Sequence, residues 1–208
     1  MKEYPIITIS REYGSGGRII GKHLAEELGL PFYDKELITR AAADSGLSPE
    51  VLEQAEDHTP SSLLYTLSTG NGLAGLMGGV GMPLGDQLFL AQFDAIRKIA
   101  GEGPCVIVGR CANYVLKDRP GAIHFFIHAD IESRIARITK EYGVPEKEAE
   151  AKIAKTDKRR ATYYNHYTSV KWGQARNYHL SVDSAALGVE RTARLLKAFV
   201  TAYREEHD

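Results

Sequence analysis

The chain has 208 residues, a formal net charge of −1 at pH 7, and apolar and charged shares of 43% and 25%. These values are typical of one soluble globular domain with a sizeable core, and they leave little room for a second domain. A dedicated nucleic-acid-binding protein usually carries a clear basic excess, which this chain lacks. Its two cysteines, Cys105 and Cys111, are too few for a disulfide framework and match no common zinc spacing, so we expect buried thiols.

The sequence has no apolar run long enough to span a membrane, and its first residues lack the apolar core of a signal peptide. We therefore expect a cytoplasmic protein that binds neither membranes nor nucleic acid. No pattern in the sequence determines the oligomeric state, so a homo-oligomer is left open.

The first part of the chain alternates between short apolar runs and helical patterns. Residues 6–10 form a β-branched run that predicts a buried strand, and a glycine cluster follows it. Apolar residues at helical spacing predict a helix over 20–28. Residues 31–33 are extended, Asp34 can cap the next helix, and residues 46–56 predict a further short helix.

The remaining elements continue the alternation after a glycine-rich apolar segment, residues 66–86, which predicts a mobile loop or a loosely ordered helix pair. We predict strands at 106–108, 123–127 and 178–182, and helices at 84–100, 131–142, 145–167 and 190–204. Because the strands are continuous apolar runs, we predict an α/β fold in which helices cover both faces of a parallel β-sheet. Ligands of such sheets bind beyond the carboxyl ends of the strands.

A glycine-rich turn follows the first predicted strand and leads into a helix. Such a turn leaves backbone N–H groups free at a helix N-terminus, where they and the helix dipole bind phosphate. The usual phosphate-binding loop, or P-loop, reads G-x-x-x-x-G-K-[ST], and this chain departs from that pattern. The predicted cofactor-binding residues are Gly14, Ser15, Gly16, Gly17, Arg18 and Ile19.

Two alignments with the P-loop pattern are open. The first keeps the lysine, as Lys22, but places the loop inside the predicted helix. The second starts at Arg11, keeps the spacing between strand and helix, and is preferred. It puts Gly17 in place of the lysine and Ile19 in place of the magnesium-binding hydroxyl residue, so that Arg18 is expected to supply the missing charge.

Arginines elsewhere in the chain suit a phosphate ligand. Arg110 follows Gly109 directly after the strand at 106–108, where a guanidinium group can bind phosphate through two hydrogen bonds. Arg40 lies on the helix after Asp34. The charged helices between 131 and 170 are predicted to form a lid over the transferred group, with these catalytic arginines: Arg134, Arg137, Arg159 and Arg160. Each arginine has an ordinary alternative, a surface charge or a salt bridge.

Four aromatic residues near the end of the lid helices allow two interpretations. Tyr163, Tyr164, Tyr167 and Trp172 can stack on a base, or they can anchor a helix to the core or to a partner subunit. Anchoring is the commoner use of such residues, and we prefer it.

Three segments together resemble the cytidylate kinase-like proteins, a branch of the nucleoside monophosphate kinases. They are residues 7–18 (ITISREYGSGGR), 33–38 (YDKELI) and 106–112 (VIVGRCA), and the resemblance covers nearly the whole chain. The motifs are specific as a set and not singly. Two departures stand out: Lys35 and Glu36 replace the Ser-Gly that follows the aspartate, and Cys111 replaces an aspartate after Arg110.

The resemblance implies one P-loop kinase domain over 1–208, with an acceptor-binding helical region at 34–100 and a lid region at 131–170. It implies transfer of the γ-phosphoryl group of ATP to a nucleoside monophosphate such as CMP, with Mg²⁺ expected from the reaction and no protein ligand assigned to it. Small-molecule nucleotides are the expected partners. The substrate-binding residues carried over by motif are Asp34, Arg40, Gly109, Arg110 and Asp183.

The altered P-loop leaves two other hypotheses open. The chain can be a non-catalytic nucleotide-binding regulatory protein, because the lysine and the hydroxyl residue are missing. It can also be a kinase of another small molecule, which would differ only in the acceptor pocket. Residues 45–86 are expected to line or cover that pocket, and the sequence is least informative there.

Overall fold

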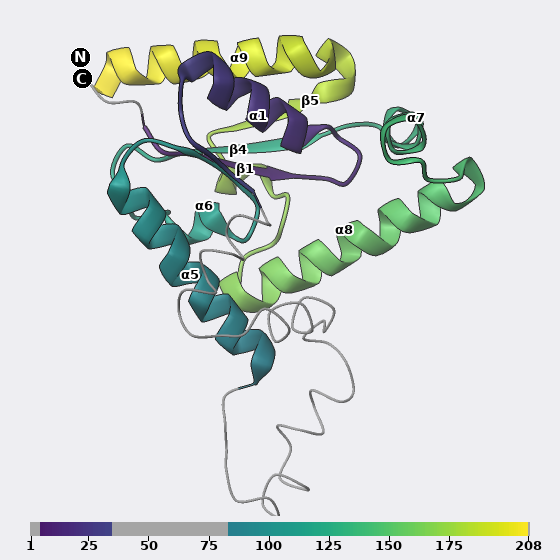
Figure 1. Cartoon of the computed structure of the whole chain (residues 1–208), viewed down its shortest axis with the longest axis horizontal. Coiled ribbons are helices and arrows are strands. Elements are labelled where there is room, and N and C mark those ends of the chain that lie inside the picture. The colour runs from purple at the N-terminus through teal and green to yellow at the C-terminus, as the bar shows by residue number, and fades with distance from the viewer. Residues whose placement is uncertain (1–4, 35–82, 208) are drawn as a thin grey trace, which may run out of the picture.

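The computed structural model describes residues 5–34 and 83–207, which form an α/β fold around one sheet (Figure 1). Five strands, all parallel, lie in the order β2-β3-β1-β4-β5. The strands are β1 (Ile7–Arg11), β2 (Phe32–Tyr33), β3 (Val106–Val108), β4 (Ile123–His128) and β5 (Leu180–Asp183). The predicted parallel sheet covered by helices is confirmed.

The helices form layers on both faces of the sheet (Figure 1). Their bounds are α1 (Gly17–Leu28), α5 (Leu84–Glu102), α6 (Ala112–Val115), α7 (Ile131–Tyr142), α8 (Glu146–Thr168) and α9 (Ser184–His207), with a 3₁₀ turn η2 (Ala175–Asn177). Helices α1 and α9 pack together on one face, whereas α5 and α6 cover the other. Helix α8 runs from α7 to the start of α5.

Two apolar clusters hold these layers to the sheet. One joins β1, β3 and β4 to α1 and α9 and includes the fully buried Ile9, Leu24, Phe125 and Leu196. The other joins the sheet to α5 and α6 through Ile96 and its neighbours. The central strands are therefore buried on both faces, which explains why their sequences are continuous apolar runs instead of alternating ones.

Most predicted elements agree with the structure within a few residues. Helix α9 starts earlier than predicted, at Ser184, and is broken at Gly188, where φ is 73°. The sequence analysis missed the short helix α6. The predicted helices after Asp34 and most of the glycine-rich segment lie outside the described residues, and so does Arg40.

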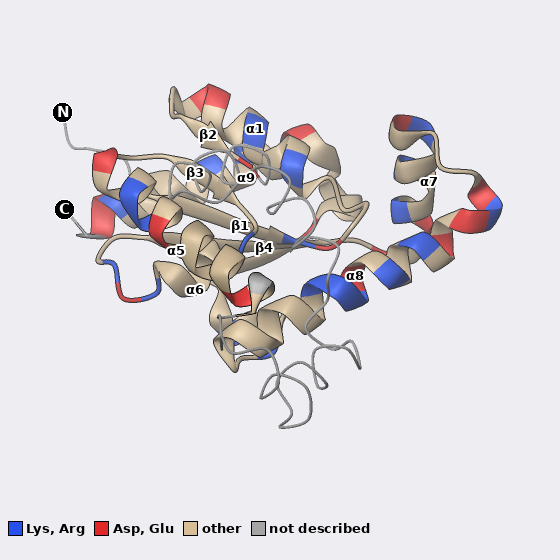
Figure 2. Ribbon diagram, turned by 60° about the horizontal axis from the view of Figure 1, so that its bottom comes forward, with Lys and Arg blue, Asp and Glu red and all other residues tan. Residues whose placement is uncertain are grey.

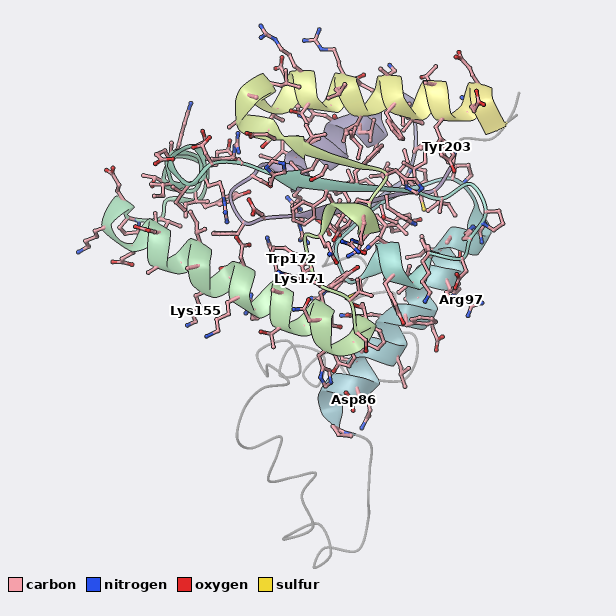
Figure 3. The ribbon with its side chains drawn as sticks, turned by 180° about the vertical axis from the view of Figure 1, so that it is seen from behind. Asp86, Arg97, Lys155, Lys171, Trp172 and Tyr203 are labelled. Carbon is pink, nitrogen blue, oxygen red and sulfur yellow. The ribbon has the colours of Figure 1, made fainter. Side chains whose placement is uncertain are left out.

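Aromatic residues anchor the last turns of α8 to α5, as preferred from the sequence. Tyr167 stacks on Phe89 with ring centroids 4.2 Å apart, and its hydroxyl donates to Asp86 at 3.0 Å. Tyr163 donates to the side-chain oxygen of Gln92 at 3.2 Å. Figure 3 shows Asp86 at the start of α5 and Lys155 on α8. The charged residues of α8 gather toward α7 instead, as Figure 2 shows.

Both cysteines are buried and free, as expected. Burial raises the pKa of Cys105 and of Cys111 to about 12, so both thiols are protonated at neutral pH. None of the helices in the described ranges is long and apolar enough to cross a membrane.

Candidate active site

The carboxyl ends of the strands bring most of the predicted site residues to one edge of the sheet. The glycine turn follows β1, Asp34 follows β2, Gly109 and Arg110 follow β3, and Asp183 ends β5. Helix α1 starts at Gly17, directly after this turn. The alignment that keeps Lys22 is therefore wrong, because Lys22 lies inside α1 and pairs with Glu26 across one helical turn at 3.8 Å.

The turn at 12–16 is held from outside through its carbonyl oxygens. Arg134 Nε donates to the Tyr13 carbonyl at 2.7 Å, and an Arg137 guanidinium nitrogen donates to the Gly14 carbonyl at 2.7 Å. The Ser184 hydroxyl donates to the Ser15 carbonyl at 2.5 Å. The two preceding carbonyls, of Arg11 and Glu12, accept from Arg160 at 3.2 Å and from the Ser15 hydroxyl at 2.9 Å.

The N–H groups of the same turn are left available. Within the described residues, the backbone N–H groups of Gly14, Gly16 and Gly17 have no hydrogen-bond partner. Gly14 and Gly16 have φ of 82° and 78°, a left-handed conformation that glycine adopts without strain. With its carbonyls bound outside and α1 starting at Gly17, the turn presents a set of N–H donors that suits a phosphate group.

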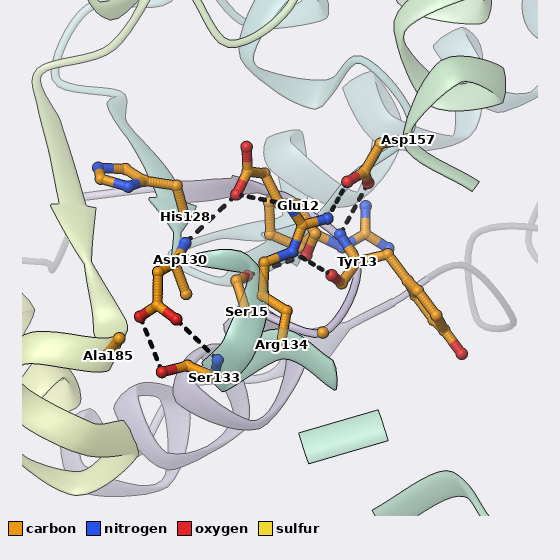
Figure 4. A network of polar contacts seen from close by, with 12 residues as sticks. Glu12, Tyr13, Ser15, His128, Asp130, Ser133, Arg134, Asp157 and Ala185 are labelled. Carbon is orange, nitrogen blue, oxygen red and sulfur yellow. Dashed lines mark hydrogen bonds and ion pairs between the residues drawn. The ribbon is translucent and has the colours of Figure 1, made fainter. Parts of the chain in front are cut away.

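A buried ionic network fixes the turn to α7 and α8 (Figure 4). The side chain of Arg134, only 9% exposed, pairs with Asp157 and, at 3.2 Å, with Glu12. Asp157 also accepts from the Tyr13 N–H at 2.8 Å, and Glu12 accepts from the Ala129 N–H at 3.3 Å. Both carboxylates are thus compensated, and they connect the turn to helices more than 100 residues away in sequence.

Arg11, the last residue of β1, extends over the start of α1. A Cβ atom at Gly17 would lie 2.5 Å from the Arg11 Cβ, and one at Gly109 would overlap its guanidinium. Burial, then the charges of Arg160 and Arg110, lower the Arg11 pKa to about 9, so the side chain stays positive at pH 7. Burial likewise lowers the pKa of Arg160.

The chain turns sharply after β3 at Gly109. Arg110 and Cys111 follow with φ of 52° and 57°, and α6 starts at Ala112. Two successive non-glycine residues in the left-handed region are costly and tend to occur at functional sites. The turn places Arg110 within electrostatic range of Arg11 at the same edge.

The predicted lid arginines have different environments. Arg134 and Arg137 bind the outside of the glycine turn, whereas Arg160 lies with its guanidinium 5.6 Å from the centre of the Tyr13 ring and 3.6 Å from Asp157. Arg159 is exposed on α8. The catalytic roles assigned to these arginines stay predictions.

Arg18 and Asp34 are bound to each other. The Arg18 Nε donates to the buried Asp34 carboxylate at 2.8 Å, while the Arg18 side chain is 55% exposed. Counting the pattern from Gly16, the hydroxyl position is Arg18, and Ile19 is one residue beyond it. Asp183 is exposed and accepts from the Ala185 N–H at 2.8 Å.

The donor set near the turn does not fit a protein-bound magnesium ion. Among the described residues, no group of three or more His, Cys, Asp or Glu side chains could hold a metal. Asp157, Glu12 and Asp34 are each paired with an arginine. Ser15 donates its hydroxyl proton to a backbone carbonyl. In the P-loop pattern a hydroxyl residue binds the ion, and here that position is an arginine.

Three groups important to the site were not identified from the sequence. They are Asp157, Ser184 and Glu12, to which the sequence analysis assigns no role. Each acts through contacts between segments distant in sequence. The only local signal was the string SREYGSGG, in which Glu12 stands beside the glycine turn.

Comparison with known proteins places this geometry in a family. A model of the cytidylate kinase-like family matches residues 6–186. The chain belongs to that family. A cytidylate kinase of Aeropyrum pernix is 25% identical over 189 residues, which cover 90% of this chain and 94% of that protein.

Solved structures share this fold. The crystal structure of an uncharacterized protein from Eubacterium ventriosum is 30% identical, with a TM-score of 0.72, and covers 95% of this chain and 98% of that one. A gluconokinase from Sinorhizobium meliloti is 16% identical, with a TM-score of 0.57 and coverage of 99% and 97%. The second likeness shows the P-loop kinase fold alone. Membership of the family supports a kinase, and P-loop kinases in general use ATP and Mg²⁺.

Proposed function

We propose that this member of the cytidylate kinase-like family is an ATP-dependent kinase that phosphorylates a nucleoside monophosphate such as CMP. The observation that carries the proposal is the glycine turn. Its carbonyls are bound from outside, and three of its N–H groups have no hydrogen-bond partner among the described residues. Those donors suit the phosphates of a nucleoside triphosphate, and the cations at the same edge suit a second phosphate.

The reaction needs no protein nucleophile. An oxygen of the acceptor phosphate forms a bond to the γ-phosphorus of ATP, the bond from that phosphorus to the β–γ bridging oxygen breaks, and its electron pair stays on ADP. The protein contributes position and positive charge around the migrating group. Because no described residue fits as a ligand of Mg²⁺, we assign no step to the metal.

Arg110 is the described residue best suited to the acceptor phosphate. It follows β3 at the same sheet edge as the glycine turn, and it lies in a strained backbone segment of the kind that occurs at functional sites. The resemblance adds Arg40, which lies outside the described residues. The identity of the base depends on the same region of the chain, so CMP is proposed from the family relationship and not from contacts.

A coupled assay of ADP release tests the proposal. The purified chain is supplied with ATP, Mg²⁺ and single acceptors: CMP, dCMP, UMP, AMP, GMP, and as non-nucleotide controls gluconate and shikimate. We expect ADP release that depends on a pyrimidine monophosphate, with the diphosphate product identified by ³¹P NMR. No release with any acceptor, while ATP still raises the melting temperature, would refute the proposal.

That refuting outcome would favour the second hypothesis, a non-catalytic nucleotide-binding protein. The observation in its favour is that neither residue of the K-[ST] pair is present at 17 and 18. Release that depends on gluconate or shikimate would instead favour a kinase of another small molecule, the third hypothesis.

A further inference from the structure

Two departures from the P-loop pattern are coupled in space. The pattern begins with glycine and has lysine six residues later, whereas this chain has Arg11 first and Gly17 at the lysine position. A Cβ atom at Gly17 would lie 2.5 Å from Cβ and 3.0 Å from Cγ of Arg11. Two non-bonded carbon atoms essentially never come so close. Positions 11 and 17 therefore cannot both carry a side chain.

The Arg11 side chain follows a defined path into the site. It leaves β1, passes over Gly17, and ends with its guanidinium against Gly109, where a Cβ atom would overlap Nη1 and lie 3.1 Å from Cζ. The guanidinium therefore lies between the carboxyl ends of β1 and β3. Its stem contacts the residue whose N–H is one of the unpartnered donors of the turn.

Among residues 5–34 and 83–207, no carboxylate is bound to the Arg11 side chain. Within the described residues, none of the hydrogen bonds or ion pairs involves the Arg11 side chain. Asp34 and Asp157 are near enough to raise its pKa, but burial and the charges of Arg160 and Arg110 outweigh them. A half-buried cation beside two others is stabilised by an anion, and a polyphosphate fits the adjoining N–H donors.

Arg18, the cation expected from the sequence, has a different environment. Its side chain is 55% exposed and its guanidinium is bound to Asp34 at 2.6 to 2.8 Å, beyond the end of β2. It would have to leave that carboxylate to reach a phosphate in the turn. Arg11 has no such carboxylate partner in the described part of the chain.

We infer that Arg11 binds the β- and γ-phosphates of the donor in place of the P-loop lysine, and that Gly17 is glycine because the Arg11 side chain occupies its space. The inference rests on the proposed function, since ATP is the ligand it names. On this inference the P-loop cation is not lost. It stands at the first position of the pattern, where the pattern has glycine, and glycine stands at the lysine position.

ATP binding measured by calorimetry tests the role of Arg11 without any need for turnover. We expect Arg11→Ala to raise the Kd for ATP about 10- to 100-fold, because a charged hydrogen bond to phosphate is removed. Arg11→Lys should recover most of the lost affinity, because it restores such a bond. AMP, which lacks the β- and γ-phosphates, should bind Arg11→Ala as it binds the wild type. The matched control is Arg119→Ala, a change at an exposed arginine before β4. It should change neither the ATP affinity nor the AMP affinity.

The exchange of positions has its own test in thermal stability. Gly17→Ala should lower the melting temperature of the wild type, because the methyl group meets Arg11. In an Arg11→Gly background the same change should lower it much less, because the Arg11 contacts are gone and only the Ile127 Cβ, at 3.3 Å, remains close. The double variant Arg11→Gly/Gly17→Lys, with the residues of the standard P-loop, should bind ATP more tightly than either single variant.

The outcomes separate the two proposals. If the chain phosphorylates an acceptor, Arg11→Ala should lower kcat about 100-fold or more, as removal of a transition-state donor does elsewhere, and Arg18→Ala should lower it far less. If no acceptor reacts, but Arg11→Ala still loses affinity for ATP and keeps its affinity for AMP, the proposed function is wrong. The contact between Arg11 and the phosphates is then still supported. Unchanged ATP affinity in Arg11→Ala, or a Gly17→Ala effect of the same size in both backgrounds, overturns the inference.

Discussion

The two sides of the glycine turn use arginine in opposite ways. On the outer side, Arg134 and Arg137 donate to backbone carbonyls and pair with carboxylates. On the inner side, Arg11 contacts two glycines and, among the residues described, forms no ion pair. An arginine therefore supports the turn where protein carbonyls and carboxylates bind its guanidinium. It serves as a ligand-binding group where the described protein groups do not.

This difference teaches how to separate structural cations from binding cations in such a site. A compensated buried arginine stabilises the fold only as long as its partners remain, so its removal leaves charges uncompensated. An uncompensated one opposes folding slightly, so its removal should cost affinity and little stability. Stability and ATP affinity should therefore respond to different variants.

The largest expected effect is on the outer side, at Arg134. Arg134→Ala should lower the free energy of unfolding by about 3–5 kcal/mol, because Asp157 and Glu12 lose their buried partner. Urea denaturation measures it, with Lys140→Ala, an exposed residue of the same helix, as the control. A loss below about 1 kcal/mol would contradict the distinction between the two sides.

His124 extends the comparison to a buried group that the protein satisfies in its neutral form. Its Nδ1 lies 2.8 Å from the Thr8 hydroxyl, and burial, with a smaller effect of His179, lowers its pKa to about 4. Since the unfolded histidine titrates near 6.5, acid favours the unfolded chain. Stability should be intact above pH 6.5 and should fall by about 3 kcal/mol as the pH drops toward 4.

The measurement is the free energy of unfolding against pH for the wild type and for His124→Gln. The variant should lack this part of the pH dependence while keeping a hydrogen-bonding group near Thr8. Parallel curves for the two proteins would show that His124 is not the responsible group.

The smallest expected effect on stability is at Ser184, which supports the turn from the outer side through its hydroxyl group. Ser184→Ala removes hydroxyl bonds to the carbonyls of Ser15 and His128, at 2.5 and 3.1 Å. We expect a loss of about 1–2 kcal/mol in stability, since two buried carbonyls lose a donor. Ser181→Ala, at an exposed position of β5, should change stability by less than about 0.5 kcal/mol. Equal effects would place Ser184 outside the support of the turn.

Local patterns in the sequence were enough to predict the strands and the turn. The β-branched run before Gly14, the apolar spacing of α1 and the runs at 106–108 and 123–127 each reflect burial, which periodicity records directly. Arg110, which follows β3, was predicted from the topology, because parallel strands bring their carboxyl ends to one edge of the sheet.

The supports of the turn and the role of Arg11 depend on tertiary contacts that no local pattern contains. Asp157 meets Tyr13 across 144 residues, and Ser184 meets Ser15 across 169. Gly17 suggested a missing lysine because the pattern is linear, whereas the space for that lysine is taken by a residue six positions earlier. Helix α6 was missed because its single turn follows two residues in an uncommon conformation.

The bond from Ser184 to Ser15 also has a consequence for folding. The glycine turn is bonded to Ser184, a residue that follows Ser15 by 169 positions. Contacts of such long sequence separation form late and slow the search for the native state. The residues around the turn cannot form this bond until α9 is in place, so a nucleotide bound at the turn would stabilise only a chain in which α9 has folded.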